Sequence, residues 1–421
     1  MIELKAVTGK GAAKMRTLFL ASLAGSLLLA SCATPHDATS VASLPASALK
    51  SARCASNLLA VDTDFPAGAL ASCTVSDGTN IAITIAPEDE PPINPSPWYA
   101  FRVTPAAPTE MKLSLSYTEH GHRYWPKISY DGVTWTYLDQ GQVKVSELAG
   151  SKMARIALES DGRPFFISAQ EIVVPATYDK WLGKLERHAD ASRSVLGQSA
   201  EGRDIPLLTI ADPFSQQRES IVLVGRQHPP EVSGALAMFP FVEELLADND
   251  LARRFRARFQ TVVVPMLNPD GVVRGHWRHA TGGVDLNRDW GKFCQPETRL
   301  MGDMIAAIEA DPARNLTFFL DFHSTQKDVV YTLSKDIETD PPGFTDAWLA
   351  DYQARVPNYE VVEEPGYSAG RGVSKNWIYD EYGVPTATFE LGDETDRELV
   401  KTLGTAAARA MMKTLLETES E

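Results

Sequence analysis

Residues 221–231, IVLVGRQHPPE, decide the fold of this chain. They begin with four consecutive aliphatic residues, a short run typical of a strand buried in a sheet. His228 and Glu231 follow just beyond it. A single His-x-x-Glu pair is more often structural than functional. Its value as evidence for a functional site therefore depends on the other motifs in the chain.

Two further strand-like runs end in polar side chains of the same kind. His323 follows the apolar run 318–322, and Glu390 follows the run 386–389. Because ligands bind at the carboxyl ends of strands in open α/β sheets, we expect these side chains to meet at one edge of a central sheet. Two imidazoles and one carboxylate are the ligand set that holds a catalytic zinc with one position open. We therefore expect His228, Glu231 and His323 to bind one zinc ion per chain.

Several other motifs occur in a fixed order along the same part of the chain. With the stretches that contain His323 and Glu390, they resemble the zinc metallocarboxypeptidase family, the carboxypeptidase A-like enzymes, over roughly residues 177–415. The additional motifs are Asn268-Pro269-Asp270-Gly271, His276-Trp277-Arg278-His279 and Val284-Asp285-Leu286-Asn287-Arg288-Asp289-Trp290.

The resemblance implies a role for each matching residue. His228, Glu231 and His323 match the zinc ligands, and Glu390 matches the general base. Arg278 matches the arginine that polarises the scissile carbonyl and stabilises the oxyanion.

The resemblance also implies how the substrate is held. Asn287 and Arg288 match the pair that grips the terminal carboxylate, and Tyr367 matches a mobile phenol that covers the substrate. A guanidinium fits a planar carboxylate in a bidentate manner, so this pair explains cleavage at a chain end. The plain alternatives are two surface arginines at 278 and 288 and a loop tyrosine at 367.

The preference for the terminal residue depends on Lys375, which falls near the family position that lines the pocket for the terminal side chain. Arg371 is close by in the sequence. A cation there favours an acidic terminal residue by Coulomb attraction. The alternative is that Lys375 is a solvated lysine at the start of a helix.

The chain divides into four segments: 1–32, 33–55, 56–176 and 177–421. Residues 56–176 contain short β-type runs separated by turn signals, which predicts a β-sandwich. This segment is similar to the domain that precedes the catalytic domain in cytosolic-type carboxypeptidases. In residues 177–421 strands alternate with helices, the first helix being expected over 178–194. The fold class is therefore α/β, a three-layer mixed-sheet carboxypeptidase-like domain preceded by a smaller all-β sandwich.

Residues 1–32 have the features of a secretory signal. A basic start precedes a short apolar core, and the ending Leu29-Ala30-Ser31-Cys32 resembles the bacterial lipoprotein box. We expect export to a bacterial periplasm, with a lipid anchor at Cys32, a flexible tether over 33–55 and Met15 as a candidate start. The alternative is ordinary cleavage near Ala33.

The cysteines and the net charge indicate which disulfides and which partners to expect. In an oxidising compartment Cys54 and Cys73 could pair, leaving Cys294 free. The net charge of −15 and the pI near 5.1 argue against nucleic acid as a partner.

The sequence thus favours a zinc carboxypeptidase acting on peptides with a free C-terminus. Two alternatives remain open: a zinc amidase or deacylase acting on amino-acid conjugates or cell-wall peptides, and a non-catalytic envelope binding protein.

Overall fold

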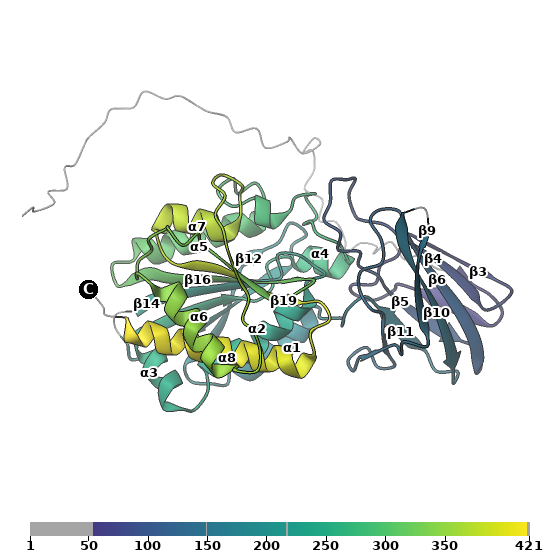
Figure 1. The fold of residues 1–421 in the computed structure, drawn as a ribbon, viewed down its shortest axis with the longest axis horizontal. Coiled ribbons are helices and arrows are strands. Elements are labelled where there is room, and N and C mark those ends of the chain that lie inside the picture. The colour runs from purple at the N-terminus through teal and green to yellow at the C-terminus, as the bar shows by residue number, and fades with distance from the viewer. Residues whose placement is uncertain (1–53, 149, 216–217, 419–421) are drawn as a thin grey trace, which may run out of the picture. The chain divides into compact units, whose positions relative to one another are not determined.

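A computed structural model describes residues 54–148, 150–215 and 218–418. Its C-terminal part is built on one eight-stranded mixed sheet in the order β12-β13-β15-β14-β16-β19-β17-β18 (Figure 1). The strands are β12 (Ala191–Gln198), β13 (Asp204–Ile210), β14 (Arg218–Gly225), β15 (Phe259–Val264), β16 (Arg314–Thr325), β17 (Val329–Thr332), β18 (Glu363–Pro365) and β19 (Thr386–Gly392).

The centre of this sheet is parallel. β14 pairs with both β15 and β16, and β16 pairs with β19, all in parallel. These strands are apolar along most of their length, as expected of strands that are covered on both faces. Their carboxyl ends meet at one edge of the sheet, which is where the expected site should lie.

Side chains alternate between two apolar layers. In β14, Ile221 and Leu223 belong to one core, and Val222 and Val224 belong to the other. α2, α6 and α8 cover the first face, whereas α5 and α7 cover the second (Figure 1). The helices are α1 (Pro175–Leu185), α2 (Val232–Leu245), α3 (Asp250–Arg258), α4 (Pro269–Arg274), α5 (Pro296–Ala310), α6 (Phe344–Arg355), α7 (Ser374–Tyr382) and α8 (Arg397–Glu417), with a single 3₁₀ turn, η1 (Leu286–Arg288). The expected three-layer α/β architecture is confirmed.

The first helix ends earlier than predicted. We expected a helix over 178–194, but α1 ends at Leu185 and β12 begins at Ala191. The residues from Ala191 onward pair with β13 as a hairpin, with Ser192 opposite Thr209. Pairing along the sheet edge therefore overrides a sequence pattern that is compatible with a helix.

The strand-rich N-terminal part has two sheets, in the orders β1-β2-β5-β11-β7-β8 and β3-β4-β6-β10-β9. In β6, Met111, Leu113 and Leu115 are buried while Lys112 is exposed, the period-two pattern of a strand with one face in a core. The strands are β1 (Cys54–Ala55), β2 (Leu59–Asp62), β3 (Ser72–Ser76), β4 (Asn80–Ile85), β5 (Ala100–Pro105), β6 (Thr109–Tyr117), β7 (Lys127–Ser129), β8 (Thr136–Tyr137), β9 (Val143–Leu148), β10 (Ser151–Ser160) and β11 (Phe165–Ser168). Buried residues of both sheets form one core, so this part is a β-sandwich.

Ion pairs join the sandwich to the α/β part. Arg123 of the sandwich donates from Nε to Asp393 at 2.8 Å. Arg397, at the start of α8, donates to both oxygens of Glu171 at 2.7 and 2.9 Å. All the described residues belong to one compact unit.

The disulfide state of the cysteines differs in part from the prediction. Cys54 and Cys73 form a disulfide that links β1 to β3. Cys294 is also disulfide-bonded, so the expectation of a free thiol there is wrong. Cys54 also takes part in β1, although it falls at the end of the segment expected to be a tether.

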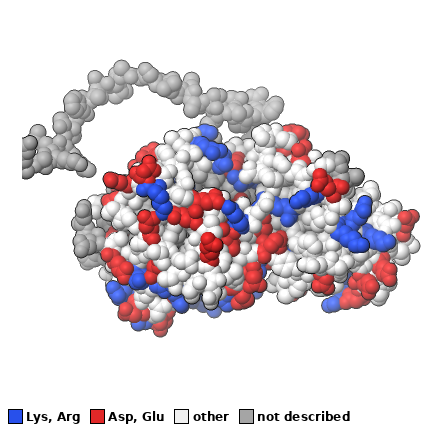
Figure 2. Space-filling model, viewed as in Figure 1, with Lys and Arg blue, Asp and Glu red and all other residues white. Residues whose placement is uncertain are grey.

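The expected signal segment 1–32, the anchor Cys32, the candidate start Met15 and the tether up to residue 53 lie outside the described residues. Among the helices that are described, none combines the length and apolar character needed to span a bilayer. Figure 2 shows acidic and basic side chains interspersed over the described surface on the face that it draws.

Candidate active site

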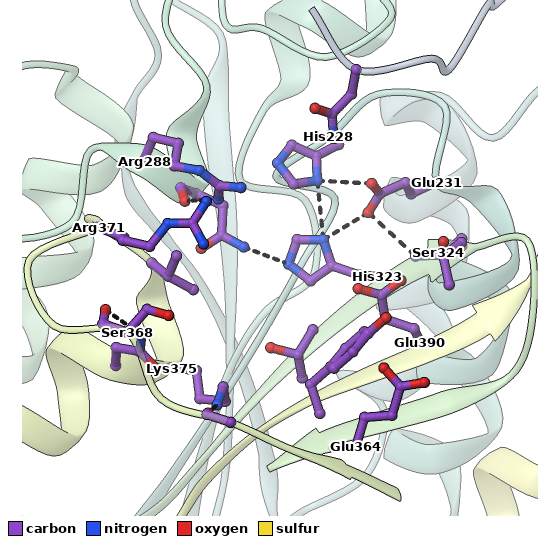
Figure 3. Close-up of a pocket in the computed structure, with 18 of the residues that line it drawn as sticks. His228, Glu231, Arg288, His323, Ser324, Glu364, Ser368, Arg371, Lys375 and Glu390 are labelled. Atoms are coloured by element: carbon purple, nitrogen blue, oxygen red, sulfur yellow. Dashed lines mark hydrogen bonds and ion pairs between the residues drawn. The ribbon is translucent and has the colours of Figure 1, made fainter. Parts of the chain in front are cut away.

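His228, Glu231 and His323 converge at the expected edge of the central sheet. His228 lies in the loop after β14, Glu231 is the residue immediately before α2, and His323 lies within β16. One ligand atom from each side chain lies within 4.8 Å of the other two, and all three side chains are buried. Figure 3 shows the three groups facing one another.

The spacing of these atoms suits a tetrahedral metal ion. The Nδ1 atoms of His228 and His323 are 3.1 Å apart, and each lies 2.7–2.8 Å from an oxygen of Glu231. Zinc with ligand bonds of about 2.0–2.1 Å holds neighbouring nitrogens about 3.3 Å apart. Two histidines and a glutamate are also a donor set that zinc prefers, so the residues present fit the ion.

The outward nitrogen of each histidine meets a carboxylate. His228 Nε2 lies 2.9 Å from Asp285, and His323 Nε2 lies 2.9 Å from the buried Asp321. Such partners fix the tautomer and the orientation of a ligating imidazole. The sequence analysis assigned neither aspartate a role, although the i, i+2 spacing of Asp321 and His323 on one strand places both on one face.

Charge and burial oppose each other at these groups. Burial disfavours ionisation, but the imidazoles of His228 and His323 hold the pKa of Glu231 well below its usual value. Burial likewise opposes the charged form of Asp285, yet His228 and Arg278 lower its pKa. Both carboxylates are therefore anionic at neutral pH.

A glycine allows α2 to approach the site. A Cβ atom at Gly234 would lie 2.2 Å from the carbonyl oxygen of His323, far inside van der Waals contact. The first turn of α2 therefore packs directly on the backbone of β16. This close approach brings Glu231 within reach of both histidines.

Glu390 lies beside His323 on the neighbouring strand. The two residues are paired in register in the parallel ladder between β16 and β19, and Figure 3 shows Glu390 next to the His323 ring. Both strands continue beyond these residues, whereas the sequence analysis placed the residues at the strand ends. Burial, with the negative charge of Glu231, raises the pKa of Glu390 to about 7.

Arg278 and Asn287 also lie in the site. Arg278 is buried and donates from Nε to Asp285 at 2.8 Å and from Nη1 to Glu231 at 3.3 Å. The Asn287 side-chain oxygen accepts from the backbone of Ser374 at 2.8 Å. Its Nδ2 lies 3.5 Å from His323 Nε2.

Arg288 and Arg371 face the pocket from the side opposite Glu390 (Figure 3). The Nη1 group of Arg288 donates to the carbonyl of Asn287 at 2.6 Å. Burial, together with the charges of Arg278 and Arg371, lowers the pKa of Arg288. Cations that crowd one another in this way favour an anionic ligand.

Lys375 is buried at the start of α7. Its ammonium donates to the backbone carbonyls of Thr332 and Gly366. These partners carry no formal charge, and burial lowers the pKa of Lys375 to about 8. The alternative of a solvated helix-start lysine is therefore wrong for this structure.

Tyr367 lies on the pocket wall in the loop after β18. Its hydroxyl donates to Asp380 on α7, and its ring packs edge-on against Tyr379. The hydrogen bond to Asp380 raises the pKa of Tyr367 to about 12.

All nine site residues expected from the sequence line one pocket of about 600 Å³, namely His228, Glu231, Arg278, Asn287, Arg288, His323, Tyr367, Lys375 and Glu390. Three residues of the sandwich, Asn94, Ser96 and Arg123, line it as well. These three residues were not predicted, because no local sequence motif marks a contact between segments so far apart in the chain.

Comparison with known proteins identifies relatives of this chain. A family profile described as zinc carboxypeptidase matches residues 178–403. Cytosolic carboxypeptidase 6 of Mus musculus is 32% identical over 139 residues, which cover 31% of this chain and 26% of that protein. Cytosolic carboxypeptidase 6 of Caenorhabditis elegans is 30% identical over 162 residues, covering 36% and 35%. The matches thus span about a quarter to a third of these relatives.

Solved structures show the same fold. A metallo-carboxypeptidase from Burkholderia cenocepacia superposes with a TM-score of 0.72 at 22% identity, covering 85% of this chain and 99% of that one. A metallo-carboxypeptidase from Pseudomonas aeruginosa in complex with (2-guanidinoethylmercapto)succinic acid gives 0.67 at 21% identity, covering 85% and 99%.

The resemblance inferred from the motifs is confirmed, because the family match covers more than half of the chain and includes all three candidate ligands. The chain therefore belongs to the zinc carboxypeptidase family.

Proposed function

We propose that this protein is a zinc-dependent metallocarboxypeptidase that hydrolyses the C-terminal bond of peptides. One observation carries the proposal. A ligand set suited to zinc, a buried glutamate and a group of arginines line the same pocket. The glutamate provides acid–base chemistry, and the arginines provide a place for a terminal carboxylate.

The residues around the pocket have different roles in this proposal. Arg288 and Asn287 bind the terminal carboxylate, because a guanidinium presents paired donors to its two oxygens. Arg278 donates to the scissile carbonyl oxygen as negative charge develops there, which is worth about 3 kcal/mol. Zinc, when bound by His228, Glu231 and His323, supplies Lewis acidity at this carbonyl.

Glu390 moves the proton. Its carboxylate accepts a proton from the attacking water and passes it to the leaving amine. A glutamate in this position suits both steps, because its carboxylate can gain the proton from water and then lose it to the amine. Tyr367, on the loop after β18, is proposed to cover the bound substrate.

A preference for acidic C-terminal residues follows from Lys375. Its buried ammonium lines the pocket, and its hydrogen-bond partners among the described residues are two neutral carbonyls. The charge is therefore available to a carboxylate of the terminal side chain, and Arg371 adds a second cation. Glu364, which also lines the pocket, is paired with Lys327.

The test is mass spectrometry of a peptide library with varied C-terminal residues, with and without a chelator of zinc. We expect chelator-sensitive release of single C-terminal residues, fastest for glutamate. Cleavage only of conjugates or cell-wall peptides that lack a free terminal carboxylate would favour an amidase or deacylase. Bound zinc without turnover of any substrate would favour a binding protein.

We also propose that the protein is exported, and that Cys32 anchors it to a membrane when its sulfur carries a lipid and takes part in no disulfide. The sequence features of residues 1–32 support this, as does the Cys54–Cys73 disulfide, since disulfides persist in oxidising compartments. Mass spectrometry of the N-terminal peptide from membrane fractions tests it. An unmodified Cys32, or a chain recovered from the cytosol, would contradict it.

A further inference from the structure

The sandwich reaches the candidate active site through residues 86–99, which connect β4 to β5. Asn94 and Ser96 of this segment line the pocket. Glu88 and Asp89, at its start, contact the loop that carries Arg278. The segment therefore connects the N-terminal sheets to the chemistry of the C-terminal part.

The carboxylate of Glu88 accepts hydrogen bonds from three successive backbone amides. One oxygen accepts from Trp277 at 2.6 Å, and the other accepts from Arg278 at 2.9 Å and from His279 at 2.7 Å. Hydrogen bonds to an ionised acceptor are about twice as strong as neutral ones. Glu88 thus fixes the backbone of this loop at Arg278, whose side chain enters the site.

Further contacts hold the same loop against the sandwich. Asp89 lies 2.7 Å from the ring of His279. Ala67 donates from its backbone to the carbonyl of Val273 at 2.8 Å. A Cβ atom at Gly275 would lie 2.7 Å from that of Ala69, so the two backbones are in close contact there.

Glu88, Asp89 and His279 also have the spacing of a metal site. Both oxygens of Glu88, however, already accept from amides of the loop. The contacts therefore make Glu88 an anchor for the loop.

We propose that Glu88 is a positioning residue that aims the guanidinium of Arg278 into the active site. The inference rests on the proposed carboxypeptidase function. Arg278 can stabilise the developing charge on the substrate only if it is already in place, because preorganised donors need no rearrangement during the reaction. The β-sandwich is then an integral part of the catalytic machinery.

The test is a double-mutant cycle between Glu88→Ala and Arg278→Ala on the full chain, with Glu88→Gln as a conservative variant. Asp131→Asn is the matched control, because Asp131 accepts from the backbone amides of Val133 and Thr134 within the sandwich and does not touch the loop. For each variant, kcat, KM, bound zinc and hydrogen–deuterium exchange of the amides at 277–279 are measured.

We expect Glu88→Ala to lower kcat by about 10²-fold with KM and zinc content little changed, the scale of loss for a displacement of about 1 Å. Glu88→Gln should lose less, because its amide oxygen still accepts a hydrogen bond. In the Arg278→Ala background, Glu88→Ala should cause no further loss. Exchange at 277–279 should accelerate in Glu88→Ala and stay unchanged in Asp131→Asn.

Unchanged kcat in Glu88→Ala would overturn the inference, as would an equal loss with and without Arg278, or unchanged exchange at 277–279. A wild-type protein that cleaves no peptide would instead refute the proposed function. The exchange measurement would still decide whether Glu88 holds the loop.

Discussion

In the proposed mechanism, some side chains of the pocket hold zinc, some bind the substrate and one transfers a proton. Glu390 is the member whose role is best separated from the others. It stands beside His323 but outside the three ligand atoms that converge. Its removal should therefore affect turnover without affecting the metal.

Glu390→Gln should retain zinc and lower kcat by at least about 10²-fold, the usual contribution of general acid–base catalysis. Zinc content and peptide hydrolysis are measured on the same preparation. Glu398→Gln, on the exposed face of α8, serves as the control. A Glu390→Gln variant with near-normal kcat would place the base elsewhere.

Charge reversal at Lys375 should invert the preference for the terminal residue. Lys375→Glu is expected to favour peptides that end in lysine over peptides that end in glutamate, because the pocket charge changes sign. Competition between the two peptides gives the ratio of kcat/KM values. The control is Lys401→Glu, at an exposed position on α8. If the order of the two peptides stays the same in Lys375→Glu, Lys375 does not select the terminal residue.

The same lysine predicts a pH dependence. Burial lowers the pKa of Lys375 to about 8, so its charge is present below that pH and is lost as the pH rises through it. The preference for C-terminal glutamate over C-terminal glutamine should therefore weaken above about pH 8. Measuring kcat/KM for this pair from about pH 6 to about pH 9.5 tests this prediction. A constant ratio across that range would show that the charge of Lys375 does not determine the preference for a terminal glutamate.

At the scale of elements, the contact between α2 and β16 sets the geometry of the ligands. Gly234→Ala should place a methyl group inside the contact distance to the His323 carbonyl and force α2 away from the sheet. We expect weaker zinc binding and a loss of stability of about 1–3 kcal/mol, the usual cost of overpacking.

Gly183→Ala in α1 is the matched helical control. A Cβ atom there meets only one side-chain oxygen at 3.9 Å, so the change should stabilise by about 0.5–1 kcal/mol. Thermal unfolding and zinc titration compare the two variants. Equal changes in stability and zinc affinity in the two variants would mean that the close contact at Gly234 does not determine the geometry of the site.

The elements that the sequence predicted well are those with a strong local signal. Apolar runs located β14 and β16, and the motifs located both histidines. The end of α1 was missed because the helix pattern continues into residues that pair in a hairpin. Glu88 was missed because it contacts residues nearly two hundred positions away in the sequence, and these contacts exist only in the folded chain.

At the scale of the whole molecule, the sandwich and the α/β part are joined by buried and partly buried polar contacts. Arg397 donates to Glu171 and to Gln170 of the connecting region, and Lys127 of the sandwich also bonds to Gln170. These bonds couple the two parts. They should therefore unfold together.

Calorimetry should show a single thermal transition for the full chain. Arg397→Ala should lower stability by about 3 kcal/mol, because it leaves Glu171 without its partner in a largely buried position. Arg163→Ala removes an exposed ion pair with Asp161 and should have little effect. Two separated transitions in the wild-type protein would show that the parts unfold independently.

We infer that three side chains hold one zinc ion at the edge of the central sheet. Anomalous diffraction at the zinc absorption edge, on crystals of the zinc-loaded protein, tests it directly. We expect one strong peak bounded by His228, Glu231 and His323. No peak there, or a principal peak at Glu88, Asp89 and His279, would contradict it.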